Sequence, residues 1–125
     1  MASFGRKLKE LRQLNKVSLR SLANELGMSP TFLSDIENER RLPPTSDKFA
    51  NSIDIIQRVL NLNDSETEQL RLCADEDLFE KGFIAKDLEN YMKNSPKAQV
   101  AMRKAISTNA PDSKWDKIIK ILEED

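Results

Sequence analysis

Four neighbouring side chains are of types that can contact the edges of nucleic-acid bases: Thr31, Phe32, Ser34 and Asp35. Thr31 and Phe32 can contact the methyl group of thymine, and the hydroxyls of Thr31 and Ser34 can donate or accept a hydrogen bond. Asp35 can only accept one, for example from the amino group of cytosine. None of the four can form the bidentate base contact that Arg, Asn and Gln form, so part of any specificity is expected to come from DNA shape.

The apolar pattern of residues 18–38 predicts two short helices that would expose these side chains. Ser18 is a good N-cap, Gly27 suits the left-handed conformation that ends a helix, and Ser29 followed by a proline opens the second helix. The small Ala23 lies where the two helices would cross. Four larger apolar side chains would fix the angle between them: Leu22, Leu26, Leu33 and Ile36. Such a pair projects the beginning of its second helix outward, where it can enter a major groove.

The rest of the chain also reads as helical, because straight-chain and charged residues abound and only three residues are Gly. We therefore expect an all-α fold. The apolar spacing predicts helices over residues 3–15, 18–27, 30–37, 46–60, 65–77, 86–93, 96–107 and 112–124. Ser65 and Glu68 suggest a capping box at the start of the fifth helix, and the acidic residues 75–77 suggest its end. We place a DNA-binding domain at residues 1–77 and a small helical C-terminal region at residues 78–125.

Positive charge gathers at the beginning of the chain, although the formal net charge is −1. Residues 1–48 hold nine Lys or Arg against six Asp or Glu, whereas residues 49–125 hold eleven against fifteen. Within residues 1–20 alone there are six basic residues and one acidic residue. A basic first part on an acidic remainder favours a polyanionic partner for the first part, although a solvated helix face would give the same count.

Several classes of function are disfavoured by residues that the sequence lacks. With no His and one Cys, neither a structural zinc site nor histidine-based catalysis is expected, and no phosphate-binding loop or nucleophile elbow is present. We therefore expect no enzyme, no metal and no cofactor. No apolar run approaches the length of a membrane span, and no signal peptide is evident. The single Cys73 excludes an internal disulfide and fits a cytoplasmic protein.

The sequence resembles the lambda-repressor-like, Cro/XRE family of helix-turn-helix regulators over residues 3 to about 62. The resemblance is carried by Leu22-Ala23, Gly27-Met28-Ser29, Leu33-Ser34-Asp35-Ile36-Glu37 and Arg40-Arg41-Leu42-Pro43-Pro44. It implies a five-helix domain that binds double-stranded DNA. It implies base-facing or sugar-facing positions at Ser29, Thr31, Phe32 and Asp35. It implies phosphate-contacting positions at Ser18, Asn38 and Arg40, with Arg41 adding charge beside them. The alternative for Phe32 is packing on the preceding helix, and the alternative for Asp35 is a solvated carboxylate.

The same resemblance implies a salt bridge between Arg12 and Glu37. Arg12 lies four residues after Leu8, at the border of the apolar face of the first helix, and Glu37 follows Ile36 at the end of the third. The expected role of this pair is to orient the third helix and not to touch bases.

The second half of the chain predicts an apolar stripe on its last helix, formed by Trp115, Ile118, Ile119 and Leu122. The stripe would either pack on the fifth or seventh helix or form the surface of a homodimer. As a dimer the protein would be a transcriptional repressor that occludes its operator. The alternative is an antitoxin or adaptor of a two-gene system, whose C-terminal half binds a partner protein such as a toxin or a metallopeptidase. A third possibility is an interaction module that has lost DNA binding.

Overall fold

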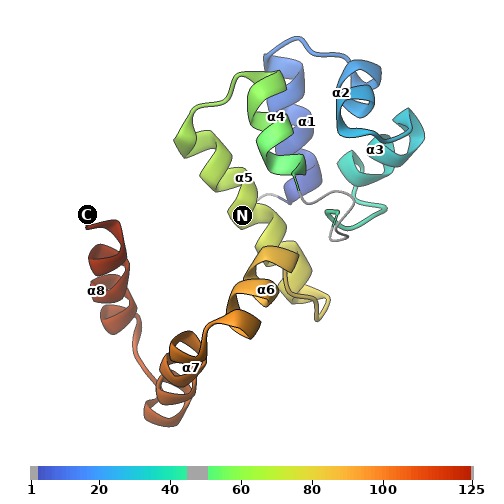
Figure 1. Ribbon diagram of the computed structural model, residues 1–125. Helices are drawn as coiled ribbons and strands as arrows, with labels where there is room; N and C mark the ends of the chain where they lie inside the picture. The colour runs from blue at the N-terminus through green and yellow to red at the C-terminus, as the bar shows by residue number, and fades with distance from the viewer. Residues whose placement is uncertain (1–2, 45–50, 125) are drawn as a thin grey trace. The chain divides into compact units, whose positions relative to one another are not determined.

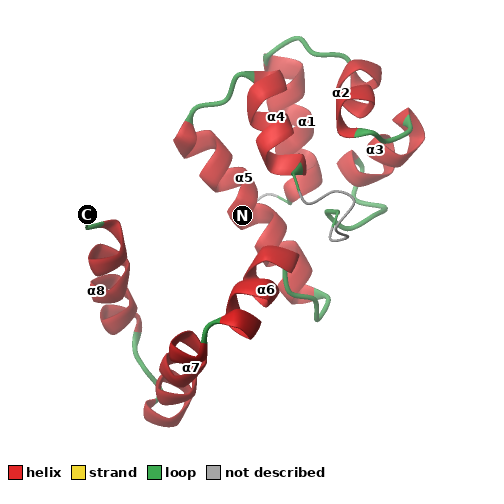
Figure 2. Cartoon of the chain, in the orientation of Figure 1, coloured by secondary structure: helices red, strands yellow, loops and turns green. Residues whose placement is uncertain are grey.

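The computed structural model describes residues 3–44 and 51–124, and all regular secondary structure in these ranges is helical (Figures 1 and 2). The helices are α1 Phe4–Leu14, α2 Leu19–Leu26, α3 Pro30–Glu37, α4 Ser52–Leu60, α5 Asp64–Glu80, α6 Lys86–Asn94, α7 Pro96–Thr108 and α8 Asp112–Glu123. The expected all-α fold is confirmed. None of these helices is long and apolar enough to cross a membrane.

The start of α5 differs from the sequence-based prediction. The capping box is formed by Asn63 and Glu66, not by Ser65 and Glu68. The Asn63 side chain accepts a hydrogen bond from the backbone N–H of Glu66 at 2.8 Å, and the Glu66 side chain accepts one from the backbone N–H of Asn63 at 3.1 Å. The reason lies upstream. Asn61 ends α4 in the left-handed conformation, so the chain has already turned when it reaches Asn63. The predicted start of α4 at Ser46, with Phe49, lies outside the described residues.

The end of α5 also lies beyond the predicted one, because α5 continues through the acidic residues 75–77 to Glu80. Two tertiary contacts hold this extension. The side chain of Leu78 is buried, and the Asp77 carboxylate accepts a hydrogen bond from the backbone N–H of Phe4 at 2.9 Å. The boundary that the sequence suggested after residue 77 therefore falls inside a helix. The chain divides into two compact units, Met1–Leu88 and Glu89–Asp125.

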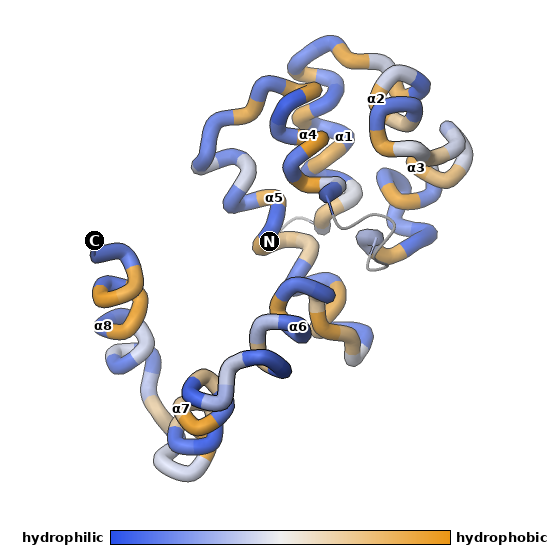
Figure 3. The backbone as a smooth tube through the Cα atoms, viewed as in Figure 1, coloured by the Kyte–Doolittle hydropathy of each residue, from blue (hydrophilic) through white to orange (hydrophobic). Residues whose placement is uncertain are grey.

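The first unit contains the hydrophobic core. Its most deeply buried side chains, each at most 2% exposed, come from all of its first five helices: Phe4, Leu8, Leu22, Ala23, Leu33, Ile36, Ile56, Leu60, Leu70 and Leu78. Both orange hydrophobic and blue hydrophilic stretches occur along these helices (Figure 3). Each helix therefore buries one face and leaves the other to solvent. Burial of Leu33 and Ile36 fixes which face of α3 points outward.

Within residues 89–124, the described part of the second unit, there is no comparable core. No residue of α7 or α8 is buried, and Leu122 is 77% exposed. The other largely exposed apolar side chains of these two helices are Val100, Met102, Ile106, Ile118, Ile119 and Ile121. Three members of the stripe predicted on the last helix, Ile118, Ile119 and Leu122, are thus exposed, whereas Trp115 is only partly exposed. An amphipathic helix with an uncovered apolar face leaves that face available for other contacts.

Candidate nucleic-acid interface

The turn between α2 and α3 is built from local capping interactions that the sequence specifies. The Ser18 hydroxyl accepts from the backbone N–H of Ser21 at 3.0 Å and begins α2. Gly27 ends α2 with φ +71°, in the left-handed region that glycine tolerates without strain. The Ser29 hydroxyl then accepts from the backbone N–H of Phe32 at 3.1 Å and begins α3, with proline at the first helical position. These caps determine where α2 and α3 begin.

Both capping serines are exposed, and this matters for anion binding. The first N–H groups of a helix lack partners within the helix, and the helix dipole favours negative charge there. Each serine satisfies one such donor and keeps its own hydroxyl proton for another acceptor. The beginnings of α2 and α3 therefore present donors of the kind that contact phosphate groups in DNA complexes.

The outward face of α3 carries the polar residues that the sequence analysis singled out. Thr31 is exposed, and Ser34 and Asp35 are partly exposed, while Leu33 between them is buried. Phe32 is intermediate, because it packs partly against the core. Phe32 therefore contacts the core with one part of its side chain and leaves another part accessible.

The residues of this face contact one another, which the sequence analysis did not foresee. Arg40 forms an ion pair with Asp35 at 3.4 Å, so Asp35 is not an isolated surface carboxylate. The Asn38 side-chain amide donates to the Ser34 hydroxyl at 3.2 Å. The Arg41 guanidinium lies over the Phe32 ring, with its Cζ 4.3 Å from the ring centroid. The loop that follows α3 is thereby attached to the outer surface of α3.

Arg12 and Glu37 lie in direct contact, and their geometry is bidentate. Arg12 Nε donates to Glu37 Oε2 at 2.7 Å and Arg12 Nη2 donates to Oε1 at 2.8 Å, while Nη1 donates to the carbonyl of Val17 at 3.1 Å. The Glu37 side chain is only 2% exposed. The hydrogen bond to Glu37 raises the pKa of Arg12 above its ordinary value and outweighs desolvation, which lowers it. The pair joins α1, the turn that precedes α2 and the end of α3.

Gly5 is a positioning residue that the sequence analysis missed. It lies in the first turn of α1, and a Cβ atom built there would overlap the backbone carbonyl oxygen of Ile36 and lie 3.2 Å from the carbonyl carbon of Glu37. Only glycine lets α1 approach the end of α3 so closely. The signal that could have found it is a glycine inside a helical pattern, which is costly unless another backbone comes near.

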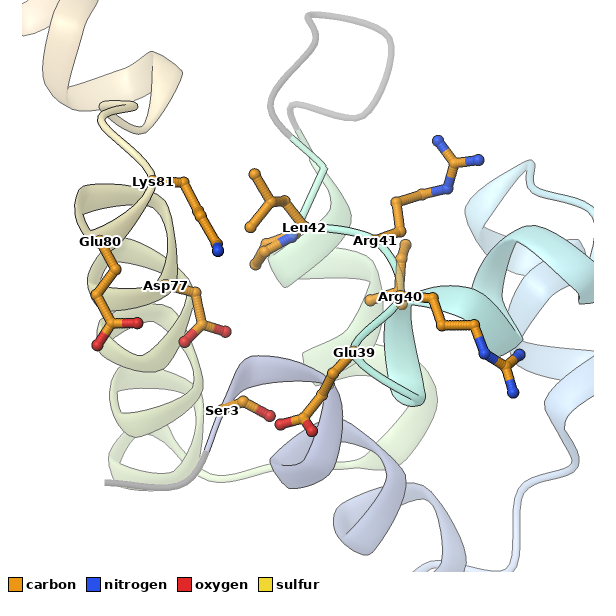
Figure 4. Close-up of a pocket in the computed structure, with 11 residues that line it drawn as sticks. Ser3, Glu39, Arg40, Arg41, Leu42, Asp77, Glu80 and Lys81 are labelled. Carbon is orange, nitrogen blue, oxygen red and sulfur yellow. The ribbon is translucent and has the colours of Figure 1, made fainter.

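A cleft of about 400 Å³ lies between the start of α1, residues 39–43 and the end of α5 (Figure 4). Asp77, Glu80 and Lys81 line its α5 side, so the lining carries both signs of charge. Figure 4 shows Arg40 and Arg41 extending away from these α5 side chains. The mixture of charges selects no ligand class. Among the described residues, no group of three or more His, Cys, Asp or Glu side chains could hold a metal ion.

Comparison with known proteins agrees with this geometry. A family model described as a helix-turn-helix domain matches residues 5–73, which is more than half of the chain. The match covers α1 to α4 and the first part of α5, and so includes every contact described above for α3. Searches of the curated proteins and of the solved structures gave no match.

Proposed function

Because the chain belongs to the helix-turn-helix domain family, a family of DNA-binding regulators, we propose that it is a sequence-specific regulator of the Cro/XRE type that binds double-stranded DNA in the cytoplasm and represses transcription by occluding its operator. The observation that carries the proposal is the construction of α3. Its inner face is buried, its beginning is capped by an exposed serine, and its end is held by the buried Arg12–Glu37 pair. A short helix held this firmly suits insertion into a major groove.

In this proposal the outer residues divide into two groups. Those on and before α3 face bases or the adjoining sugars: Ser29, Thr31, Phe32, Ser34 and Asp35. Those around it contact phosphates, together with the backbone N–H groups at the two helix beginnings: Ser18, Asn38 and Arg40. Arg41 adds positive charge beside them. Phosphate contacts set the position of the protein on the duplex, and base contacts select the sequence.

We further propose that the protein acts as a homodimer, because one helix-turn-helix module contacts only a short half-site. The C-terminal region that we placed at residues 78–125 would supply the contacts. Its supporting observation is the uncovered apolar face of α8, and Ile119 and Leu122 are both at least half exposed.

The same observation favours a second candidate. An uncovered apolar helix also suits a different protein, as in an antitoxin or adaptor whose C-terminal half binds a toxin or a metallopeptidase. Both candidates bind DNA through α3 and differ in the partner of the second unit. Identification of a toxin or metallopeptidase gene beside this one would favour the second candidate.

The test of DNA binding is a salt titration combined with selection from random duplexes. Each phosphate that the protein neutralises should contribute a slope of about −0.9 to the dependence of log K on log salt. The proposal expects a steep slope and one enriched sequence. A flat titration between low and physiological salt, or no enriched sequence, would contradict it. Charge reversal of Arg40 is the matched variant, and it should weaken binding to all duplexes.

A further inference from the structure

Arg41 follows the end of α3 in the sequence, yet its side chain reaches back to α3. Its guanidinium carbon lies 4.3 Å from the centroid of the Phe32 ring, and Phe32 belongs to the first turn of α3. Planar guanidinium groups stack on aromatic faces, and the attraction increases when the cation is partly desolvated. The contact therefore holds Arg41 beside a residue that the proposed function places next to bases.

The donors of Arg41 are available in this arrangement. A cation–π contact uses the face of the guanidinium, whereas its five N–H groups point outward in the plane. Arg41 is exposed and makes no ion pair or hydrogen bond through its side chain within residues 3–44 and 51–124. Its neighbour Arg40 differs, because one of its nitrogen atoms is paired with Asp35. Figure 4 shows that Arg41 is also directed away from the carboxylates of α5.

None of the exposed or partly exposed polar side chains on α3 itself can supply a bidentate donor. Thr31 and Ser34 offer single hydroxyls, and Asp35 only accepts hydrogen bonds. The amide of Asn38, at the end of α3, already donates to Ser34. The base partner of a bidentate arginine in the major groove is guanine, through its O6 and N7 atoms.

Resting on the proposed function, we propose that Arg41 is a base-reading residue that recognises a guanine in each half-site, and that Phe32 is the platform that orients it. A guanidinium can also bind a phosphate through two of its N–H groups, but such a contact is the same for every base sequence. A base contact requires one orientation, and stacking on Phe32 removes part of the ordering cost before DNA is bound. Phe32 thus acts through Arg41 as a positioning residue as well as through its own contacts.

The first experiment compares the sequences selected from random duplexes by the full chain and by Arg41→Lys. Lysine keeps the positive charge but loses the planar fork. The wild type should prefer guanine over other bases at one position of the half-site by roughly 5- to 150-fold, the range of one bidentate contact. Arg41→Lys should lose most of that preference while its affinity for unrelated duplexes stays the same.

The second experiment replaces each guanine of the selected site in turn by 7-deazaguanine, which lacks the N7 acceptor and still pairs with cytosine. One position should weaken the wild type several-fold and leave Arg41→Ala unchanged, because the two changes remove the same contact. Phe32→Leu keeps apolar volume against the core but removes the ring, so it should reduce the penalty at that position. Arg20→Lys, at an exposed cation on α2, is the matched control and should behave as the wild type.

The outcomes separate this inference from the proposed function. A wild type that selects no sequence would defeat the proposed function itself. A different outcome would overturn only the base-reading role. In that outcome the wild type selects a sequence, Arg41→Lys selects the same guanine, and each 7-deazaguanine substitution weakens Arg41→Ala as much as it weakens the wild type. Arg41 would then be a contact to the DNA backbone. The 7-deazaguanine scan of the wild type needs no variant, and the absence of any sensitive position would also overturn the base-reading role.

Discussion

At the scale of single residues, the ionisable side chains of the first unit differ in how strongly their surroundings constrain them. Glu37 is buried and fully engaged by Arg12, whereas the Arg40–Asp35 pair lies in solvent. Cys73 is also buried, and desolvation followed by the nearby charges of Asp77 and Glu76 raises the pKa of its thiol. A thiol with a raised pKa stays protonated near neutral pH and reacts slowly, so Cys73 acts as a core residue.

We expect Glu37→Ala to destabilise the first unit by about 3 kcal/mol, because it leaves the Arg12 guanidinium largely buried without its carboxylate. For a unit of this size the melting temperature should fall by roughly 10–20 °C. Operator affinity should fall as well, since α3 loses the contact that holds its end. Thermal unfolding and a binding titration measure the two effects.

Glu25→Ala is the matched control for this prediction. Glu25 pairs with Arg58 at 3.6 Å, and both side chains are largely exposed. Removing an exposed pair should cost less than about 1 kcal/mol. Unchanged melting and unchanged affinity in Glu37→Ala would refute the positioning role of the Arg12–Glu37 pair.

A second residue-scale prediction concerns Asp75. Desolvation and, to a smaller extent, the charge of Asp87 raise its pKa above the ordinary value of 3.8, while Arg71 lowers it. A carboxyl whose pKa is raised by folding binds its proton more tightly in the folded state. Its favourable contribution to stability is therefore present below pH 3.8 and is lost as the pH rises through the folded pKa.

Asp75→Asn should therefore raise the melting temperature at pH 7 and leave it nearly unchanged at a pH below 3.8. Thermal unfolding at the two pH values measures this. Asp116→Asn, at an exposed position of α8, should change neither temperature. An equal gain for Asp75→Asn at both pH values would show that charge is not the cause.

At the scale of elements, the position of α3 depends on close approach as well as on burial. α1 contacts α3 through Gly5 near one end and through Arg12 near the other, and α2 also packs against α3. α5 extends the same arrangement, because Asp77 accepts a hydrogen bond from the first residue of α1. α3 is thus supported partly by α1 and α5, to which the proposed function assigns no contact with DNA.

Gly5→Ala tests this support directly. The added methyl group would overlap the carbonyl of Ile36, so α1 and the end of α3 must separate. We expect a destabilisation of about 1–3 kcal/mol, as for other overpacked sites, and a loss of operator affinity larger than the loss of affinity for unrelated duplexes.

Leu14→Ala is a suitable control, because Leu14 is a largely exposed residue of the same helix. It should leave both melting and binding close to the wild type. Circular dichroism during thermal unfolding, together with binding titrations on selected and unrelated duplexes, provides the readouts. A stable Gly5→Ala variant with normal selectivity would show that α3 tolerates displacement.

At the scale of the whole molecule, the two units differ in how they are stabilised. The first unit buries a continuous core, whereas α7 and α8 leave their apolar side chains largely exposed. Burial of apolar surface is the main favourable contribution to folding, so the second unit has more to gain from a partner. This difference is the physical basis for placing assembly in the second half of the chain.

Charge substitution on α8 tests the proposed dimer. Two changes should each dissociate the dimer: the double substitution of Ile119 and Leu122 by lysine, and the deletion of residues 111–125. Neither change removes a side chain that is buried among the described residues. Binding to two half-sites should weaken more than binding to one. Sedimentation at micromolar concentration measures assembly, and Lys117→Ala is the exposed control. A wild type that is monomeric both alone and on DNA would favour the antitoxin or adaptor candidate.

Features with local causes could be predicted from the order of the residues alone. Three such features were predicted correctly: the helix periodicity, the caps at Ser18 and Ser29, and the left-handed Gly27. Each depends on residues only a few positions apart. The all-α fold and the helix-turn-helix followed from them. The Arg12–Glu37 contact, by contrast, came from resemblance, because nothing in the spacing of these two residues requires it.

Features that join distant segments become visible only in the folded protein. The requirement for glycine at position 5 comes from the backbone of α3, and the end of α5 is held by the burial of Leu78 and by the hydrogen bond from Phe4 to Asp77. The Arg41–Phe32 contact depends on how the loop folds back, and sequence reasoning had assigned Arg41 only charge. In each case the cause is a residue that is distant in the sequence or a loop conformation, and neither can be predicted from local helix propensity.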